Sequence, residues 1–256
     1  MTSERALRTE LSAVAKSLHA RGFCANHEGN VTARLERGRF LATPGAVSKR
    51  LCEPDALVVL DEKGAVASGR GKSFSEAALH LAVYRVRADV GAVVHAHPPY
   101  ATAFACAGRA LDRPILAEAV VSLGAEIPLV PFSAPGEAAV AALAPFLERF
   151  DAVLLGSHGV LAWGDDLEQA SLRLEHVEQV ARICQLAEPL GGARALPAEA
   201  LPALLEARRK AFPRLAKAAP SGPPVSARPT ATVIPSASPD LARIIAEELA
   251  SALRGR

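Results

Sequence analysis

Residues 92–99 read Ala-Val-Val-His-Ala-His-Pro-Pro, and the rest of the chain is organised around this stretch. Its apolar part predicts a short strand, which Pro98 and Pro99 end because proline cannot donate a ladder hydrogen bond. His95 and His97 are spaced i, i+2, so on a strand both imidazoles point to the same face, about 7 Å apart along the chain. Two neutral imidazoles at a strand end form half of a site for a metal such as zinc. Two polar residues at an ordinary strand edge would give the same pattern.

The composition indicates a globular protein without an electrostatic preference for nucleic acid or a membrane surface. Of the 256 residues, 50% are hydrophobic and 22% are charged, and the formal net charge is +2. The charged N-terminus does not resemble a signal peptide, and no apolar run reaches the ~18 residues of a membrane span. The cysteines are widely scattered, so we expect buried, reduced thiols at Cys24, Cys52, Cys106 and Cys184. These features favour a cytoplasmic protein that binds neither nucleic acid nor membrane.

The mixture of helical and hairpin-like strand patterns predicts an α/β layered domain with a largely antiparallel or mixed sheet. Helical patterns cover residues 4–21, 73–87, 100–107, 136–149, 165–188 and 198–211. Strand patterns cover residues 31–35, 40–43, 56–61, 66–68, 91–97, 152–155 and 160–163. Residues 119–124 and 128–132 flank a polar turn.

The end of the chain has a different composition from the rest. We expect one domain over residues 1–212, followed by a Pro/Ala/Ser-rich linker over residues 213–239. Residues 240–256 have the spacing of a last amphipathic helix. Because a solitary helix of that length is marginal, it either docks on its own domain or a neighbouring subunit, or frays.

Three further side chains can extend the histidine pair. His158 lies in a glycine-flanked turn between two apolar strands, where a histidine is either presented to a site or simply exposed. Glu76 lies in the first turn of the helix predicted over residues 73–87, with serines available as N-caps, but the helix dipole favours an acid there in any protein. His80, one turn later, is either a ligand or a histidine near the core, and we favour the core.

Three turns offer hydroxyl, amide or backbone N–H groups to an anion: Gly29-Asn30, Thr43-Pro44-Gly45 and Ser73 to Ser75. The last precedes a predicted helix, whose N-terminal N–H groups favour negative charge. Each turn alone is common, and their combination with the histidines is what favours a binding site.

Five motifs occur in a fixed order: G-N-V-T at 29–32, T-P-G at 43–45, S-E-x-x-x-H-x-x-x-Y at 75–84, A-V-V-H-A-H-P-P-Y-A at 92–101 and L-L-G-S-H-G-V-L-A-W-G at 154–164. With them the sequence resembles the class II aldolase/adducin family, which contains the L-fuculose-phosphate and L-rhamnulose-phosphate aldolases. The resemblance covers roughly Leu7 to Leu186 and implies a three-layer α/β fold, with a central mixed or mainly antiparallel sheet and helices on both faces.

The resemblance implies a role for each motif residue. His95, His97 and His158 match the family's three zinc ligands, and Glu76 matches the carboxylate that serves as base beside the metal. The residues that match the phosphate pocket are Asn30, Thr43, Gly45 and Ser75, with Gly29 and Ser73 as neighbours. Family members are commonly homotetramers with active sites at subunit interfaces, and another divalent metal can replace zinc.

These residue types suit an aldol cleavage of a small hydroxylated keto compound, such as the sugar phosphate L-fuculose 1-phosphate. Breaking a carbon–carbon bond beside a ketone leaves an enediolate, whose charge a chelating zinc stabilises. Three histidine ligands leave coordination positions open for a substrate, and a carboxylate near the cation can move a proton at carbon. A phosphate would supply binding energy remote from the reacting bond.

Two departures from the family pattern leave alternatives open. Glu118 stands where the fuculose-phosphate aldolases have a catalytic tyrosine. A glutamate at this position resembles the methylthioribulose-phosphate dehydratases and favours dehydration or decarboxylation with Glu118 as acid/base. A surface acid would look the same. The Thr43-Pro44-Gly45 turn is also one residue shorter than its counterpart and lacks a hydroxyl, so the substrate is not necessarily a phosphate ester.

A further alternative to an enzyme is a non-catalytic, adducin-like interaction module, although such modules are expected to lack the metal ligands.

Overall fold

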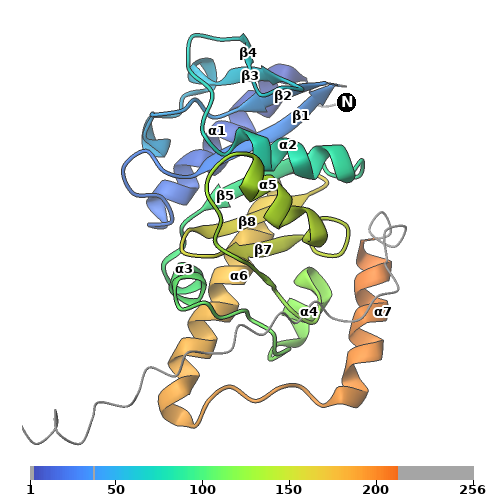
Figure 1. Cartoon of the computed structure of the whole chain (residues 1–256). Coiled ribbons are helices and arrows are strands. Elements are labelled where there is room, and N and C mark those ends of the chain that lie inside the picture. Colours follow the sequence, from blue (N-terminus) through green and yellow to red (C-terminus); the bar gives the residue numbers. More distant parts are fainter. Residues whose placement is uncertain (1–2, 37, 213–256) are drawn as a thin grey trace, which may run out of the picture. The chain divides into compact units, whose positions relative to one another are not determined.

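The computed structural model describes residues 3–36 and 38–212, and an eight-stranded sheet forms the centre of this part of the chain (Figure 1). The strands are β1 (Asn30–Glu36), β2 (Arg39–Ala42), β3 (Val58–Asp61), β4 (Val66–Ser68), β5 (Ala92–Ala96), β6 (Leu129–Val130), β7 (Ala152–Leu155) and β8 (Gly159–Gly164). Their order is β4-β3-β2-β1-β5-β8-β7-β6. Only the β6–β7 pair is parallel, so the prediction of a mixed, mainly antiparallel sheet is confirmed.

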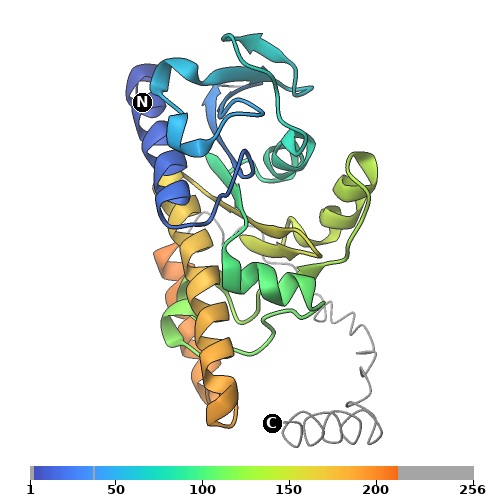
Figure 2. The ribbon, with the colours of Figure 1, turned by 90° about the vertical axis from the view of Figure 1, so that its left-hand side faces the viewer.

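Helices cover both faces of the sheet, as predicted (Figure 2). On one face, α1 (Glu4–Ala20), α3 (Pro99–Cys106) and α6 (Leu167–Ala187) share a buried apolar cluster with the strands. On the other face, α2 (Ala77–Val86) and α5 (Glu137–Leu143) form a second cluster. Two further helices, α4 (Ala117–Leu123) and α7 (Leu201–Ala211), pack against each other. Burial of apolar surface in these two clusters is the main stabilising contribution to the fold.

Strand β5 fixes which face carries the histidines. All five of its residues are buried, and it pairs antiparallel with β1 on one side and β8 on the other. Val94 packs into the α1/α6 cluster, whereas Val93 packs into the α2/α5 cluster. Because side chains alternate along a strand, His95 points to the same face as Val93, the face that α2 covers.

Several predicted boundaries are wrong by a few residues, for local reasons. Helix α2 begins at Ala77 rather than at residue 73, and neither a serine nor Glu76 makes a side-chain capping hydrogen bond. Strand β3 begins at Val58 because Pro54–Ala56 forms a 3-10 helix. Helix α5 ends at Leu143, where a 3-10 turn that contains Pro145 follows.

The remaining expectations have mixed outcomes. Cys24, Cys52 and Cys184 are buried thiols as predicted, but Cys106 is exposed at the end of α3, so the prediction is wrong for that residue. Across residues 3–36 and 38–212, no helix is both long and apolar enough to cross a membrane. The linker predicted over residues 213–239 and the helix predicted over residues 240–256 lie outside the described residues.

Candidate functional site

Three histidines converge at the end of β5. His95 is in the strand, His97 follows it, and His158 is in the turn that connects β7 to β8. The ring centroids lie 5.0 Å (His95–His97), 4.6 Å (His95–His158) and 4.9 Å (His97–His158) apart. One ring nitrogen from each histidine lies within 4.8 Å of the others. His158 lies more than 60 positions from His95 and His97 in the sequence, and the fold brings the three together.

Strand pairing explains this convergence. Ala96 is the register partner of Val160, so the end of β5 lies beside the start of β8 and the His158 turn. Gly159 is required in this turn, because a Cβ there would lie 2.5 Å from both the Ala96 carbonyl oxygen and His97 Cδ2. Ser157 adopts φ 53°, a left-handed conformation that turns the chain tightly before His158.

The hydrogen bonds of the first two histidines fix where their lone pairs point. His95 Nδ1 lies 2.9 Å from the Val160 carbonyl oxygen, and His97 Nδ1 lies 3.0 Å from Glu28 Oε2. Both oxygens only accept hydrogen bonds, so each ring carries a proton on Nδ1. The two Nε2 atoms face each other, 3.2 Å apart. This is close to the separation of about 3.3 Å between two nitrogen ligands of one tetrahedral zinc with bonds of about 2.0 Å.

Burial favours the neutral form of His95 and of His158. Desolvation, followed by the neighbouring His158 and His97, holds the pKa of His95 well below its ordinary value. Burial is also the main cause that lowers the pKa of His158, with His97 adding to it and Glu76 opposing it. Neutral imidazole is the form that ligates a metal.

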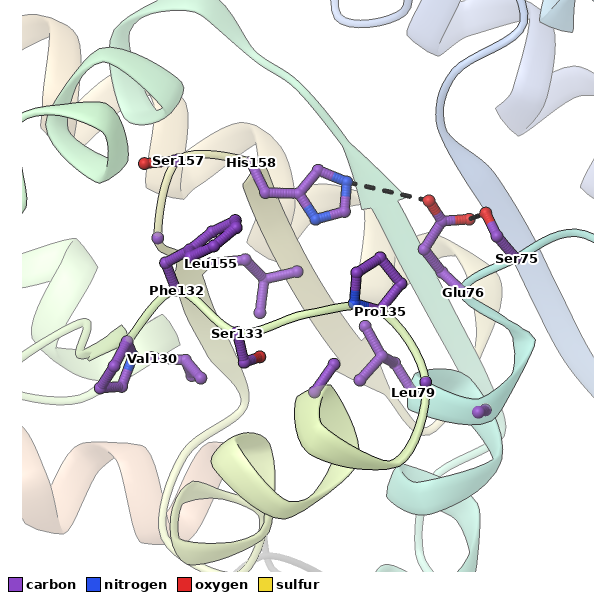
Figure 3. A pocket seen from close by; sticks show the side chains of 15 residues that line it. Ser75, Glu76, Leu79, Val130, Phe132, Ser133, Pro135, Leu155, Ser157 and His158 are labelled. Atoms are coloured by element: carbon purple, nitrogen blue, oxygen red, sulfur yellow. Dashed lines mark hydrogen bonds and ion pairs between the residues drawn. The ribbon is translucent and has the colours of Figure 1, made fainter.

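Glu76 lies beside the histidines at the start of α2. Its Oε1 atom lies 3.8 Å from His158 Nε2 (Figure 3). Its other oxygen, Oε2, accepts hydrogen bonds from Asn30 Nδ2 at 3.2 Å and Ser75 Oγ at 2.7 Å. The carboxylate is thus oriented by two donors on one oxygen, while the second oxygen faces His158.

The three predicted anion-binding turns meet near Glu76. Gly45 N donates to the Lys72 carbonyl oxygen at 2.8 Å, and a Cβ on Gly45 would lie 2.5 Å from the Ser73 carbonyl oxygen. Asn30 is the register partner of His95. Thr43 is fully buried and its Oγ1 accepts a hydrogen bond from Val31 N, so its hydroxyl supports the sheet.

Asn30 and Gly29 are neighbours in the predicted binding loop but have different roles. Asn30 Oδ1 is buried and has no hydrogen-bond partner within the described part of the chain. Gly29, at φ 75°, approaches the sheet so closely that a Cβ would lie 2.3 Å from Cys24 Sγ and 3.1 Å from the His95 carbonyl oxygen. Gly29 therefore holds its loop against β5, and Asn30 offers a free acceptor.

A mainly apolar cavity of about 280 Å³ opens beside Glu76 and His158 (Figure 3). It lies between the start of α2, the segment that follows β6, and the β7–β8 turn. Polar atoms at its wall come from Glu76, His158 and three serines, Ser75, Ser133 and Ser157. The apolar wall is formed by Ala78, Leu79, Val130, Pro131, Phe132, Pro135, Ala139 and Leu155.

Comparison with known proteins identifies the family of this fold and site. The family model described as "Class II Aldolase and Adducin N-terminal domain" matches residues 9–185. The chain belongs to the class II aldolase and adducin family.

Individual members show which reactions this family contains. The chain is 33% identical over 186 residues to a 3-oxo-tetronate 4-phosphate decarboxylase of Escherichia coli K12, covering 70% of this chain and 86% of the relative. It is 30% identical over 193 residues to a 5-deoxy-D-ribulose 1-phosphate aldolase of Bacillus thuringiensis, covering 74% and 89%. A solved L-fuculose 1-phosphate aldolase superposes with a TM-score of 0.73 at 28% identity, covering 80% and 96%. The chain is thus an enzyme of the class II aldolase superfamily.

The histidine cluster suits the divalent cation on which class II aldolases typically depend. Three imidazoles with ring nitrogens within 4.8 Å of one another, two of these nitrogens 3.2 Å apart, form a donor set of the kind that zinc accepts. His80, by contrast, is fully buried away from this cluster and forms a hydrogen bond with Thr32 Oγ1, so its assignment to the core is confirmed.

Glu118 is a predicted site residue that the chain does not bring to its own histidines. It is exposed in the first turn of α4 and is absent from the lining of the cavity beside Glu76. The ionisable group that it influences is His176 of α6, whose pKa is lowered by burial and raised in part by Glu118.

Two charged residues near the site were missed by sequence reasoning. Glu28 contacts His97, and Lys49 is buried where its Nζ donates to the His27 carbonyl oxygen at 3.0 Å and the Val47 carbonyl oxygen at 2.9 Å. Burial lowers the pKa of Lys49, and the nearby Cys52, Cys24, Glu76 and Glu28 oppose that shift. The only sequence signal for Glu28 was its position directly before Gly29-Asn30, and Lys49 gave none.

Proposed function

We propose that the protein is a divalent-metal-dependent lyase that cleaves a carbon–carbon bond in a small hydroxylated ketose phosphate. The observation that carries the proposal is the opposed pair of Nε2 atoms of His95 and His97, 3.2 Å apart, with His158 beside them. These three residues would hold the metal, for which zinc is the best candidate. When bound, the metal supplies a Lewis acid that stabilises the negative charge that develops beside the ketone.

Glu76 is proposed to move the proton. In an aldol cleavage the hydroxyl proton leaves, the hydroxyl carbon becomes an aldehyde, and the electron pair of the broken bond stays on the ketone fragment. That fragment is then protonated at carbon. Because Asn30 and Ser75 both hydrogen-bond to Oε2, we assign this proton transfer to Oε1, the oxygen that faces His158.

The surroundings of Glu76 support a substrate with two different ends. The loops at Gly29-Asn30, Gly45 and Ser73 to Ser75 meet beside Glu76. Lys49 donates to the backbone beside the first two of these loops, at His27 and Val47. A positive charge next to these loops favours a phosphate between them. The apolar cavity on the other side favours a terminal group without charge, such as the deoxy end of the substrate of the Bacillus thuringiensis relative.

Decarboxylation is the second candidate. Loss of carbon dioxide from a 3-oxo acid leaves negative charge beside a ketone as aldol cleavage does, so the same site stabilises both reactions. Similarity to the Escherichia coli decarboxylase favours it, and so does Glu118 as an acid/base, for either decarboxylation or dehydration. The apolar wall of the cavity argues against a carboxylate-bearing substrate, so we place aldol cleavage first.

Self-association would complete this proposal. Large apolar side chains are exposed at Phe132 (73%) and Leu190 (86%), as expected of a surface that another copy covers. We propose a cytoplasmic homotetramer in which Glu118 acts in the site of a neighbouring copy, since Glu118 lies outside its own cavity.

A substrate panel tests the reaction. Zinc-loaded enzyme is given L-fuculose 1-phosphate, 5-deoxy-D-ribulose 1-phosphate, D-ribulose 1-phosphate and a 3-oxo-tetronate 4-phosphate, and released aldehyde and carbon dioxide are both measured. We expect aldehyde from a ketose phosphate and none from Glu76→Gln. Carbon dioxide without aldehyde would establish the second candidate, and no turnover of any substrate by metal-loaded enzyme would contradict both.

A cavity variant tests the substrate class in the same assay. Leu79→Asn places a polar group in the apolar wall, so kcat/KM for the 5-deoxy ketose phosphate should fall about tenfold more than for its 5-hydroxy counterpart. An equal loss for the two substrates would show that the cavity does not receive this end.

A further inference from the structure

We propose that Glu28 is a positioning residue that fixes the ring of His97 for metal binding. Glu28 Oε2 lies 3.0 Å from His97 Nδ1, and the side chains are 35% and 20% exposed. A carboxylate at this nitrogen holds the proton on Nδ1, so the lone pair of Nε2 is directed at the other two histidines. It also makes the imidazole a stronger donor, because a negative charge behind the ring raises electron density at Nε2.

The carboxylate is itself held in place by its own loop. Glu28 Oε1 accepts a hydrogen bond from Ala25 N at 2.6 Å, and Glu28 N donates to the Ala25 carbonyl oxygen at 3.2 Å. Asn26, between them, adopts φ 46°, the left-handed conformation that lets the loop close on itself. Each carboxylate oxygen thus accepts one hydrogen bond, one from the loop and one from His97.

The same loop also holds the backbone of His97. His97 N donates to the Phe23 carbonyl oxygen at 2.8 Å, so the loop contacts this residue through both its main chain and its side chain. His95 has no such support from a charged group, because its Nδ1 donates to the neutral Val160 carbonyl oxygen. The two neighbouring histidines are therefore oriented by different means, and His97 depends on a residue outside the sheet.

Only a carboxylate satisfies both contacts of Glu28. An amide side chain has a single acceptor oxygen, so Glu28→Gln can accept from Ala25 N or from His97 Nδ1, but not from both. Alanine removes both acceptors. The expected order of metal affinity is accordingly glutamate, glutamine, alanine.

The test measures metal binding rather than turnover. Metal-free protein is titrated with zinc in competition with a chromogenic chelator, and the visible spectrum is recorded with cobalt(II), whose absorption reports its ligand geometry. For Glu28→Ala we expect the zinc dissociation constant to rise about 10- to 100-fold and the cobalt spectrum to change. Glu28→Gln should lie between this variant and the wild type. Glu36→Gln, on the exposed end of β1, is the control and should behave as the wild type does.

The inference rests on the proposed function in one respect, the binding of a divalent cation by the histidines. If wild-type protein binds zinc and Glu28→Ala binds it equally well with an unchanged cobalt spectrum, Glu28 does not position His97 and the proposed function stands. If wild-type protein binds no divalent cation, the positioning role of Glu28 and the proposed metal-dependent function are both contradicted. Circular dichroism verifies that the variants fold, and should Glu28→Ala unfold, the isosteric Glu28→Gln decides, with unchanged affinity and spectrum overturning the proposal.

Discussion

His80 and His95 are both buried, but their ring nitrogens meet different surroundings. In each, one nitrogen is hydrogen-bonded, to Thr32 for His80 and to Val160 for His95. The second nitrogen of His80 has no partner within the described residues, whereas that of His95 faces two other histidines. The first residue is a core histidine and the second belongs to the candidate metal site. Sequence spacing made the same distinction, because only His95 ends a strand together with another histidine.

His80 makes the stability of the fold depend on pH. Burial lowers its pKa from 6.5 to about 3. Between these values the unfolded chain binds a proton that the folded chain does not, so stability increases with pH. The contribution is complete above pH 6.5 and is lost as the pH falls toward about 3.

Replacing His80 should weaken this pH dependence. Between pH 6.5 and pH 5, the low pKa of His80 lowers the free energy of unfolding by about 2 kcal/mol. His80→Leu should remove about this part of the decrease. Denaturant unfolding at the two pH values measures the difference, with the exposed His27→Gln as control. An unchanged slope in His80→Leu would mean that the ring already accepts a proton in the folded state.

At the scale of elements, the strands were predictable and the ends of the helices less so. Strands β5, β7 and β8 follow mainly apolar runs because both faces of the sheet are covered, and β1 shows an alternating pattern. Both patterns are visible in one sequence. The start of α2 was placed too early because Ser73 to Ser75 resemble helix caps. In the fold, this segment contacts Gly45, and such a long-range contact leaves no local pattern.

Arg208 hydrogen-bonds α7 to the rest of the fold. The helix has no buried residue, and Arg208 donates to the Val121 and Ser122 carbonyl oxygens and to Asp151. Asp151, at 2% exposure, also pairs with Arg87 at 3.1 Å. Arg208 therefore connects α7 to a buried ionic cluster that remains paired without it.

Removing Arg208 should release α7 without unfolding the sheet. We expect Arg208→Ala to lose about 1.5–3 kcal/mol of local stability, the contribution of hydrogen bonds to a charged group. Deuterium uptake in Leu201–Ala211 should then increase while uptake in α6 stays low. Arg209→Ala, whose partner Glu206 lies in the same helix, is the matched control. Unchanged protection of α7 in Arg208→Ala would show that other contacts hold the helix.

At the scale of the whole molecule, the fold of one chain brings most of the candidate site together, and our proposal assigns Glu118 to a neighbouring copy. The histidines and Glu76 come from three separate segments and meet within one chain. Their roles were inferred from motifs, but Glu28 was not, since a side chain that acts through a neighbouring loop carries no spacing of its own. Glu118 lies elsewhere on the chain, and our proposal assigns it to a neighbouring copy.

Mixing two inactive variants tests that assignment. Glu76→Gln and Glu118→Gln should each lose most of kcat as homotetramers, whereas mixed tetramers contain some sites with both carboxylates intact. After subunit exchange we expect partial recovery of activity, in particles of about 107 kDa, four times the 26.7 kDa chain. If mixtures stay inactive although exchange is demonstrated, the two carboxylates do not share a site between copies.

The metal content of purified protein tests the central claim most directly. Elemental analysis after reconstitution should find close to one zinc or other divalent ion per chain in the wild type, and almost none in His97→Ala or His158→Ala. His80→Leu, which lies outside the cluster, should keep the full amount. A wild-type protein that binds no divalent ion, or a His158→Ala variant that stays fully loaded, would contradict a metal centre built from His95, His97 and His158.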